Sequence, residues 1–546
     1  MKTQITTIFA LVSCGFSFAQ TVQDGTYKTE NERFSESKAL FDALIAKEPN
    51  NGTYYFYKAE NFYEWSQVDK SPDYVDSAKV SWTKCSKVDG ENPLSIVAQG
   101  KILWLNNDQV GAKAAFAKAL SSTKNKNAEV MRAIAETYIE SPVQSLDDAI
   151  NVLNLAIKLD PKNEDSQLLL GDALLAKTPD NGSEAIKCYN EVLKINPKSP
   201  RGIVRVANLY RRAQNWETAN DYYKEAISID PTYAPAYREN AELYFLFGSG
   251  QLAIQNWEKY LELNNGNEAR YRYASSLYIA GQYCDAIKQI ESLQAANFNN
   301  YFMERILAYC YYECNQSDGI DVSVATTNGL QALERYFGIV PSDKIIFEDF
   351  KYKGMLLSLS GSDSLAIIEL SKGYELNPTA HEILGEIGKL YFKAKKYDQV
   401  IEVYNKKKSV SELKGLEYYD LGRSYYYGPK DYVAADDAFA KLNELSNSYY
   451  PGFLWRARVT YFVDTVQTNY SQKPYYEKVY ELITADDKNT KFGKTAFVES
   501  ARYLGRFYSF NDSPGKDIEK ARAYWNNIVE MDPNDADAAA FFKENP

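Results

Sequence analysis

The stretch that decides the fold is residues 200–233, PRGIVRVANLYRRAQNWETANDYYKEAISIDPTY. Its closing phrase EAISIDP ends at Pro231, which lies 34 residues after Pro197 of the phrase EVLKINP. Proline has no amide hydrogen to donate and disfavours helix in the residue before it, so each phrase is typical of a helix end. Similar phrases end at Pro161, Pro378 and Pro533. A period of this length predicts stacked helical hairpins rather than one large core.

Small and aromatic residues recur at fixed places within this period. The unit at 200–233 and the unit that follows it share these places, with Ala207, Tyr210, Ala219 and Tyr223 in the first and Ala241, Tyr244, Ala253 and Trp257 in the second. Further along, 34-residue steps separate Gly354, Gly388 and Gly422. A small side chain lets two helices cross closely, and an aromatic ring fills the space beside the crossing. This pattern resembles the tetratricopeptide repeat, a helix–turn–helix unit, over nearly the whole chain.

The resemblance implies an all-α fold, a right-handed superhelical solenoid of about a dozen tetratricopeptide-like hairpins. We divide the chain into a signal peptide (1–19), the solenoid (20–446), a degenerate repeat with loops (447–496) and a C-terminal repeat with its cap (497–546). The spacing between Ala308 and Gly329 is longer than the repeat allows and predicts an inserted loop at Asn315–Asn328. Polar stretches at 464–473 and 485–494 predict further loops.

The N-terminus has the pattern of an export signal. Lys2 precedes an apolar stretch, Ile5–Val12, and small residues at Ser17 and Ala19 are typical of a cleavage site before Gln20. We therefore expect an exported protein, in the periplasm first, with secretion as an alternative. A second interpretation is a lipoprotein signal that would anchor the chain through a lipid on Cys14. The apolar stretch is too short to span a bilayer, and no later stretch predicts a transmembrane segment.

Composition and residue types argue against nucleic-acid binding and catalysis. The 546-residue chain has a net charge of −11, which repels the phosphate backbone of nucleic acids. It contains one histidine, His381, so most catalytic triads and zinc sites are excluded. We expect His381 to be solvated at the start of a helix. The sequence has no phosphate-binding loop. We predict a protein that is not an enzyme and needs no cofactor or metal.

The cysteines do not predict a disulfide framework. Five follow Ala19, scattered along the chain: Cys85, Cys188, Cys284, Cys310 and Cys314. Domains held by disulfides are short and rich in cysteine. We therefore interpret most of these residues as small buried apolar side chains, including Cys310 and Cys314, which lie on one face of a predicted helix.

Arginines and tyrosines on successive helices predict a binding surface. In tetratricopeptide superhelices the first helix of each hairpin lines the concave surface, and that resemblance places one set of residues there: Arg201, Arg205, Asn208, Arg212, Arg238 and Arg272. Aromatic residues flank them at Tyr237, Tyr271 and Tyr273. Guanidinium groups suit carboxylates, so we expect acidic segments or free C-termini as ligands and expect Arg205 and Arg238 to face solvent. In the alternative interpretation, the arginines only balance acidic neighbours.

The similarity to chaperone-binding tetratricopeptide domains is incomplete. Their two-carboxylate clamp requires lysine where this chain has Val204, and only Asn208 agrees with it. We therefore predict a scaffold or adaptor of the bacterial cell envelope that binds peptide or helical segments of partner proteins in its concave groove. Two alternatives remain open, a glycan-binding or surface-attachment repeat protein and a regulatory module of an envelope enzyme complex. The sequence leaves the oligomeric state open.

Overall fold

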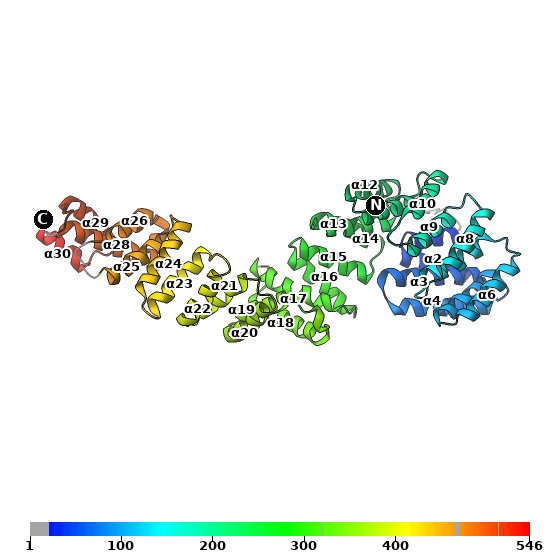
Figure 1. The fold of residues 1–546 in the computed structure, drawn as a ribbon, viewed down its shortest axis with the longest axis horizontal. Helices are drawn as coiled ribbons and strands as arrows, with labels where there is room; N and C mark the ends of the chain where they lie inside the picture. The colour runs from blue at the N-terminus through cyan, green and yellow to red at the C-terminus, as the bar shows by residue number, and fades with distance from the viewer. Residues whose placement is uncertain (1–20, 318, 465–469, 511–512) are drawn as a thin grey trace, which may run out of the picture. The chain divides into compact units, whose positions relative to one another are not determined.

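A computed structural model describes residues 21–317, 319–464, 470–510 and 513–546 (Figure 1). Within these ranges the chain forms thirty α-helices and no strand, and successive helices pair as hairpins. The all-α solenoid of tandem hairpins is therefore confirmed. The predicted signal peptide and Cys14 lie outside the described residues. No helix in the described ranges is long and apolar enough to cross a bilayer.

The helices fall into two compact units, which divide between Glu313 and Cys314. The first unit contains α1 Val22–Glu30, α2 Phe34–Lys47, α3 Gly52–Asp69, α4 Pro72–Val88, α5 Pro93–Leu105, α6 Gln109–Ser122, α7 Ala128–Glu140, α8 Leu146–Leu159, α9 Glu164–Lys177, α10 Ser183–Ile195, α11 Pro200–Arg212, α12 Trp216–Ile229, α13 Ala234–Leu246, α14 Gly250–Leu263, α15 Asn267–Ile279, α16 Tyr283–Ala295 and most of α17 Tyr301–Gln316.

The second unit contains the remaining helices and one short 3₁₀ turn, Ser342–Lys344. Its helices are α18 Val322–Ile339, α19 Phe347–Leu359, α20 Asp363–Leu376, α21 Glu382–Lys393, α22 Tyr397–Lys408, α23 Gly415–Tyr427, α24 Tyr432–Leu445, α25 Tyr450–Val463, α26 Lys473–Leu482, α27 Ala485–Asn489, α28 Lys491–Ser509, α29 Ile518–Met531 and α30 Ala536–Glu544. The division at Glu313 is additional to the boundaries that we predict from sequence.

Helix ends follow the proline phrases. Helices α8, α10, α12, α20 and α29 each end two residues before the proline of their phrase. The next helix often begins with a side-chain cap. Ser199, for example, accepts a hydrogen bond from the amide of Gly202 at the start of α11, where Pro200 needs no acceptor for an amide hydrogen. The repeated phrase therefore encodes the turn from one hairpin to the next.

The repeat positions that hold small and aromatic residues form the core. Ala207, Ala219 and Tyr223 are fully buried where α11 and α12 cross. At the corresponding crossing of α23 and α24, a Cβ atom on Gly422 would lie 2.7 Å from the ring of Phe439. The aromatic ring of the second helix thus packs directly on the small residue of the first, which explains why both residue types recur together.

The structure corrects two loop predictions. Helix α18 begins at Val322, inside the stretch 315–328 that we expect to be a loop, because Asp321 caps it by accepting from the amide of Ser323. The polar stretch 485–494 is also largely helical, since Thr484 caps α27 and Thr490 caps α28. In both places the polar residues serve as helix caps, which the repeat spacing does not reveal.

The cysteines and the histidine also differ from expectation. Cys284 and Cys314 are disulfide-bonded, which the sequence does not predict, although Cys314 is buried as expected. Cys85, Cys188 and Cys310 are free and buried. Disulfide formation depends on the approach of side chains from different helices, and spacing along the chain does not report it. His381 is half-buried at the N-cap of α21, and its Nδ1 is shielded from solvent rather than hydrated.

Candidate functional site

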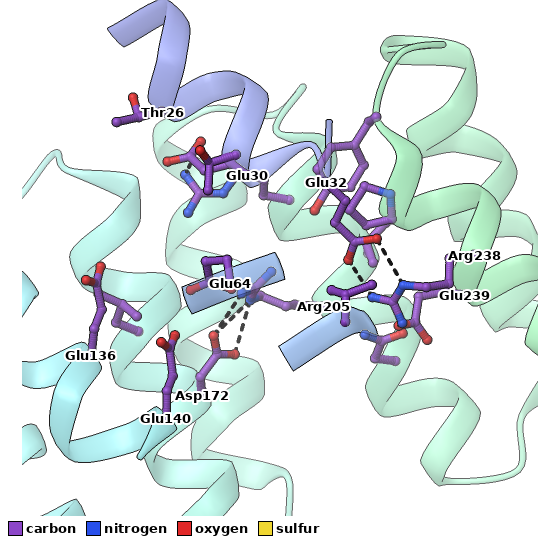
Figure 2. A pocket seen from close by; sticks show the side chains of 18 of the residues that line it. Thr26, Glu30, Glu32, Glu64, Glu136, Glu140, Asp172, Arg205, Arg238 and Glu239 are labelled. Atoms are coloured by element: carbon purple, nitrogen blue, oxygen red, sulfur yellow. Dashed lines mark hydrogen bonds and ion pairs between the residues drawn. The ribbon is translucent and has the colours of Figure 1, made fainter. Parts of the chain in front are cut away.

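A cavity of about 410 Å³ lies inside the first unit, among the first helices of successive hairpins (Figure 2). Charged side chains line it from α1, α3, α7, α9, α11 and α13. Carboxylates predominate on the α3 and α7 side, and arginines lie on α11 and α13. The charged lining includes Glu30, Glu32, Glu64, Glu136, Glu140, Asp172, Arg201, Arg205 and Arg238.

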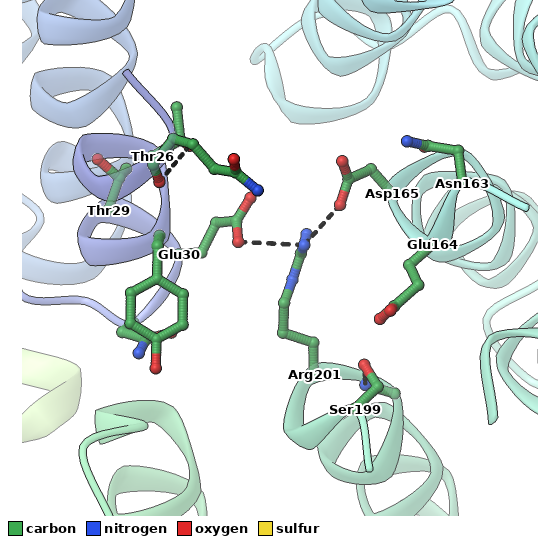
Figure 3. Close-up of polar contacts among 12 residues, drawn as sticks. Thr26, Thr29, Glu30, Asn163, Glu164, Asp165, Ser199 and Arg201 are labelled. Atoms are coloured by element: carbon green, nitrogen blue, oxygen red, sulfur yellow. Dashed lines mark hydrogen bonds and ion pairs between the residues drawn. The ribbon is translucent and has the colours of Figure 1, made fainter. Parts of the chain in front are cut away.

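The N-terminal helix α1 closes this cavity through an ion pair with α11. Arg201 Nη1 lies 3.1 Å from Glu30 Oε2 and 2.5 Å from Asp165 Oδ1, so one guanidinium joins carboxylates of α1 and α9 (Figure 3). Burial raises the pKa of Glu30, and Arg201 opposes that rise. Helix α1, the first that the structure describes, is therefore held against the inner face by charge.

The segment that follows α1 makes a second contact, with α13. Arg238 donates from Nη2 to Glu32 Oε1 at 2.8 Å and from Nε to Glu32 Oε2 at 3.1 Å. The Tyr260 hydroxyl also donates to Glu32 Oε2, at 2.7 Å. One helical turn earlier, the Tyr27 hydroxyl donates to Asp230 at 2.6 Å. Segment 27–32 is thus an acidic stretch of the chain bound to inner-face residues that lie about two hundred positions away in sequence.

Arg205 pairs within the wall of the cavity. Its Nε and Nη2 donate to the two carboxylate oxygens of Asp172 at 3.1 and 2.9 Å, and the Tyr189 hydroxyl donates to the same carboxylate at 2.7 Å. Burial alone would lower the pKa of Arg205, but Asp172 more than compensates and raises it. This fork-to-carboxylate geometry keeps the guanidinium charged and fixed in place.

Carboxyl groups crowd the opposite wall around Lys101. The Lys101 ammonium lies 2.5 Å from Glu60 and 3.7 Å from Glu136, and its side chain is only 3% exposed. Burial raises the pKa of Glu136 to about 8, and it also raises the pKa of Glu64 and Glu140. One buried cation cannot neutralise this many carboxylates, so part of the wall is protonated near neutral pH.

The structure gathers some of the predicted site residues and separates others. Arg201, Arg205, Asn208 and Arg238 line the cavity. Our expectation that Arg205 and Arg238 face solvent is wrong, because both are ion-paired and their side chains are each only 30% exposed. The partners on α9 lie about one repeat away in sequence, whereas Glu30 and Glu32 lie far from Arg201 and Arg238, and no pattern along the chain identifies them.

The other predicted residues lie outside the cavity lining and make local contacts. Arg212 donates to the Pro179 carbonyl at 2.6 Å, and Arg272 lies 3.0 Å from Glu268. The Tyr237 hydroxyl donates to the Pro231 carbonyl at 3.3 Å, and the Tyr273 hydroxyl donates to Glu258 at 3.0 Å. Tyr271 is buried against Phe298.

Comparison with known proteins identifies the repeat. No family model matches the chain. The chain is 30% identical to the C-terminal part of a TPR repeat-containing protein from Cytophaga hutchinsonii, over 50% of this chain and 98% of that one, with a TM-score of 0.42. It is 24% identical over 228 residues to a TPR repeat-containing protein of Methanocaldococcus jannaschii, which is 38% of each chain.

A second curated relative carries the same repeat in its name. The chain is 27% identical over 111 residues to the small glutamine-rich tetratricopeptide repeat-containing protein 2 of Mycosarcoma maydis, which is 20% of this chain and 32% of that protein. In the curated relatives that it matches, the chain spans only 23% to 38% of their length. The 30% sequence identity to the Cytophaga protein extends over 98% of that chain. Together with the tandem hairpins of this chain, it shows that the protein belongs to the tetratricopeptide-repeat family.

Proposed function

We propose that this protein is a non-enzymatic scaffold of the bacterial cell envelope that binds segments of partner proteins on the inner faces of its hairpins. Tetratricopeptide-repeat proteins bind protein partners, and a contact within this chain supports the same mode of binding here. Segment 27–32 lies on α11 and α13 with its carboxylates on Arg201 and Arg238. That contact is the observation that carries the proposal, because an acidic partner segment would meet the same groups.

The contact also indicates how binding in the first unit would proceed. Since the chain's own Glu30 and Glu32 occupy the two guanidinium groups, a partner segment would have to displace them. Both pairs are charge-assisted, so an incoming carboxylate would regain the electrostatic contact that the released segment gives up, and further contacts of the partner would have to offset the entropy lost on association. We therefore expect partners to carry acidic residues.

Two observations support a location of this protein outside the cytosol. The N-terminal pattern with its cleavage site after Ala19 is typical of exported proteins, and Cys284 and Cys314 are disulfide-bonded. Disulfides persist in oxidising compartments such as the periplasm. Mass spectrometry of the native protein should find an N-terminus at Gln20, whereas an acylated peptide that begins at Cys14 would indicate a lipid anchor.

Proximity labelling from the full chain in its native envelope tests the scaffold proposal. We expect a reproducible set of labelled envelope proteins that a similarly expressed, exported control protein does not label. A glycan array run with the same protein tests the carbohydrate alternative. Strong array binding together with a protein set no different from the control would overturn the proposal.

A further inference from the structure

Arg423 in the second unit is set apart from the other arginines. Among the arginines in the described part of the chain, Arg423 alone has neither a hydrogen bond nor an ion pair, and its Nε is shielded from solvent without an acceptor. Asp420, one helical turn earlier, interacts electrostatically with Arg423, which opposes the burial-driven rise in the Asp420 pKa, but the two groups lie beyond ion-pair distance. The nearby cations Lys389 and Lys393 are already paired, with Glu386 and Asp363. Arg423 is therefore a cation with unused donors in an acidic chain.

Aromatic rings surround this guanidinium from three successive inner helices. The Arg423 Cζ atom lies 4.8 Å from the ring centre of Phe392 on α21, 5.2 Å from that of Tyr419 on α23 and 5.7 Å from that of Trp455 on α25. Tyr427, at 6.0 Å, provides a fourth ring. The face of an aromatic ring attracts a cation. It does not serve as a hydrogen-bond acceptor for the N–H groups, which point outward in the plane of the guanidinium. The rings thus hold the cation while its donors remain available.

The position of Arg423 in the repeat places it on the binding face. Arg423 follows the small packing residue Gly422 just as Asn208 follows Ala207 in the first unit, and Asn208 lines the cavity there. Aromatic surface continues from Tyr427, which is 45% exposed, through the neighbouring Tyr426 to Phe462 of α25, which is 45% exposed and whose ring centre lies 6.0 Å from that of Tyr426. A charged group and an exposed aromatic surface therefore lie together on the inner face.

We propose that Arg423 and the rings around it form a binding site for a carboxylate that is flanked by apolar side chains in an extended segment of a partner protein. The guanidinium donates to a carboxylate at two points, and the surrounding rings exclude water and so strengthen that contact. Tyr427 and Phe462 would cover the apolar side chains that flank the carboxylate. This inference rests on the proposed scaffold function and names a site that is open, in contrast to the self-occupied cavity of the first unit.

A random heptapeptide library displayed on phage and selected on the full chain tests the site. We expect enriched peptides with Asp or Glu next to an aromatic or aliphatic residue. Synthetic copies should lose affinity at least about ten-fold when the acid is changed to its amide. A copy with an amidated C-terminus separates a side-chain carboxylate from a terminal one.

Variants at Arg423 decide whether the site lies there. Arg423→Gln should remove the difference between acid and amide peptides, and Arg423→Lys should retain only part of it, because lysine lacks the planar fork. Arg506→Gln, which alters an ion-paired arginine of the same unit, is the matched control and should bind like the wild type. Unchanged circular dichroism and thermal unfolding of Arg423→Gln would show that its fold is intact.

The outcomes separate this inference from the scaffold proposal. Acidic peptides that bind Arg423→Gln as tightly as wild type, or a selection with no preference for acids, would overturn the site. If proximity labelling still finds partners in either case, the scaffold proposal stands without it. If labelling finds none, the scaffold proposal fails whatever the peptides do.

Discussion

Glu32, in the turn after the first helix, forms a two-point ion pair with Arg238 of α13, 206 residues further along the chain. Tyr260 donates a third hydrogen bond to the same carboxylate. The side chain of Glu32 is only 11% exposed, so this contact closes the first unit on itself in a protected setting. It also explains why Arg238, an inner-face arginine of an acidic protein, is not a free cation.

A double-mutant cycle on this pair measures its strength. Glu32→Gln and Arg238→Gln should couple by about 1–3 kcal/mol in urea unfolding, because a hydrogen-bonded charge pair is worth more when water is largely excluded. The pair Lys187 and Glu184, whose side chains are 69% and 60% exposed, is the control and should couple much more weakly. Equal coupling in the two pairs would show that the contact of Glu32 with α13 adds no more to stability than an exposed pair does.

Overpacking tests the register of the repeat. Ala219 and Ala253 are fully buried at the helix crossings, so Ala219→Leu or Ala253→Leu should lower the free energy of unfolding by about 1–3 kcal/mol. Ala117, exposed on α6, is the matched control, and Ala117→Leu should change little. Thermal unfolding followed by circular dichroism makes the comparison. A buried variant as stable as the control would mean that these alanines do not set the helix crossing.

The crowded carboxyls of the cavity predict a pH dependence. The pKa of Glu136 rises from 4.5 to about 8 in the folded chain. Between these two pH values the folded state keeps a proton that the unfolded state releases. The free energy of unfolding should therefore fall as pH rises through this window, and Glu64 and Glu140 act in the same direction.

Glu136→Gln isolates this effect. The amide cannot ionise, so the variant should lose less stability than wild type between pH 5 and about pH 8 in urea titrations. Glu184→Gln, on the exposed face of α10, is the control and should follow the wild-type pH profile. A wild-type profile in Glu136→Gln would show that Glu136 ionises normally in the fold.

Sequence predicts the repeat well because the repeat is local. A 34-residue period reflects contacts within about one hairpin. Such contacts determine the helix ends near Pro197 and Pro231 and the burial of Ala207 and Ala219. The pairing of Glu32 with Arg238 depends on how hairpins far apart in sequence stack, and no local pattern encodes it. The disulfide state of Cys284 likewise depends on three-dimensional geometry. The cap at Asp321 is local, but it lies outside the 34-residue pattern that predicts the other helices.

Thiol counting tests the oxidised state and, with it, the proposed export. The protein is isolated from its natural source, unfolded in denaturant without reductant and alkylated. Cys85, Cys188 and Cys310 should then be modified, whereas Cys284 and Cys314 should react only after reduction. Mass spectrometry of the peptides distinguishes the two groups. Complete alkylation before reduction would indicate a reducing compartment and count against the envelope.

Site-specific photo-crosslinking in the native envelope tests the central claim, that partners bind on the inner faces, most directly. A photoreactive phenylalanine analogue at Tyr427, on the exposed inner surface of α23, should capture protein partners. The same analogue at Ile368, 50% exposed on the second helix of its hairpin, should capture few or none. Adducts at Tyr427 that are absent at Ile368 are the predicted result. The same adducts at both positions, or adducts at Ile368 alone, would contradict the account.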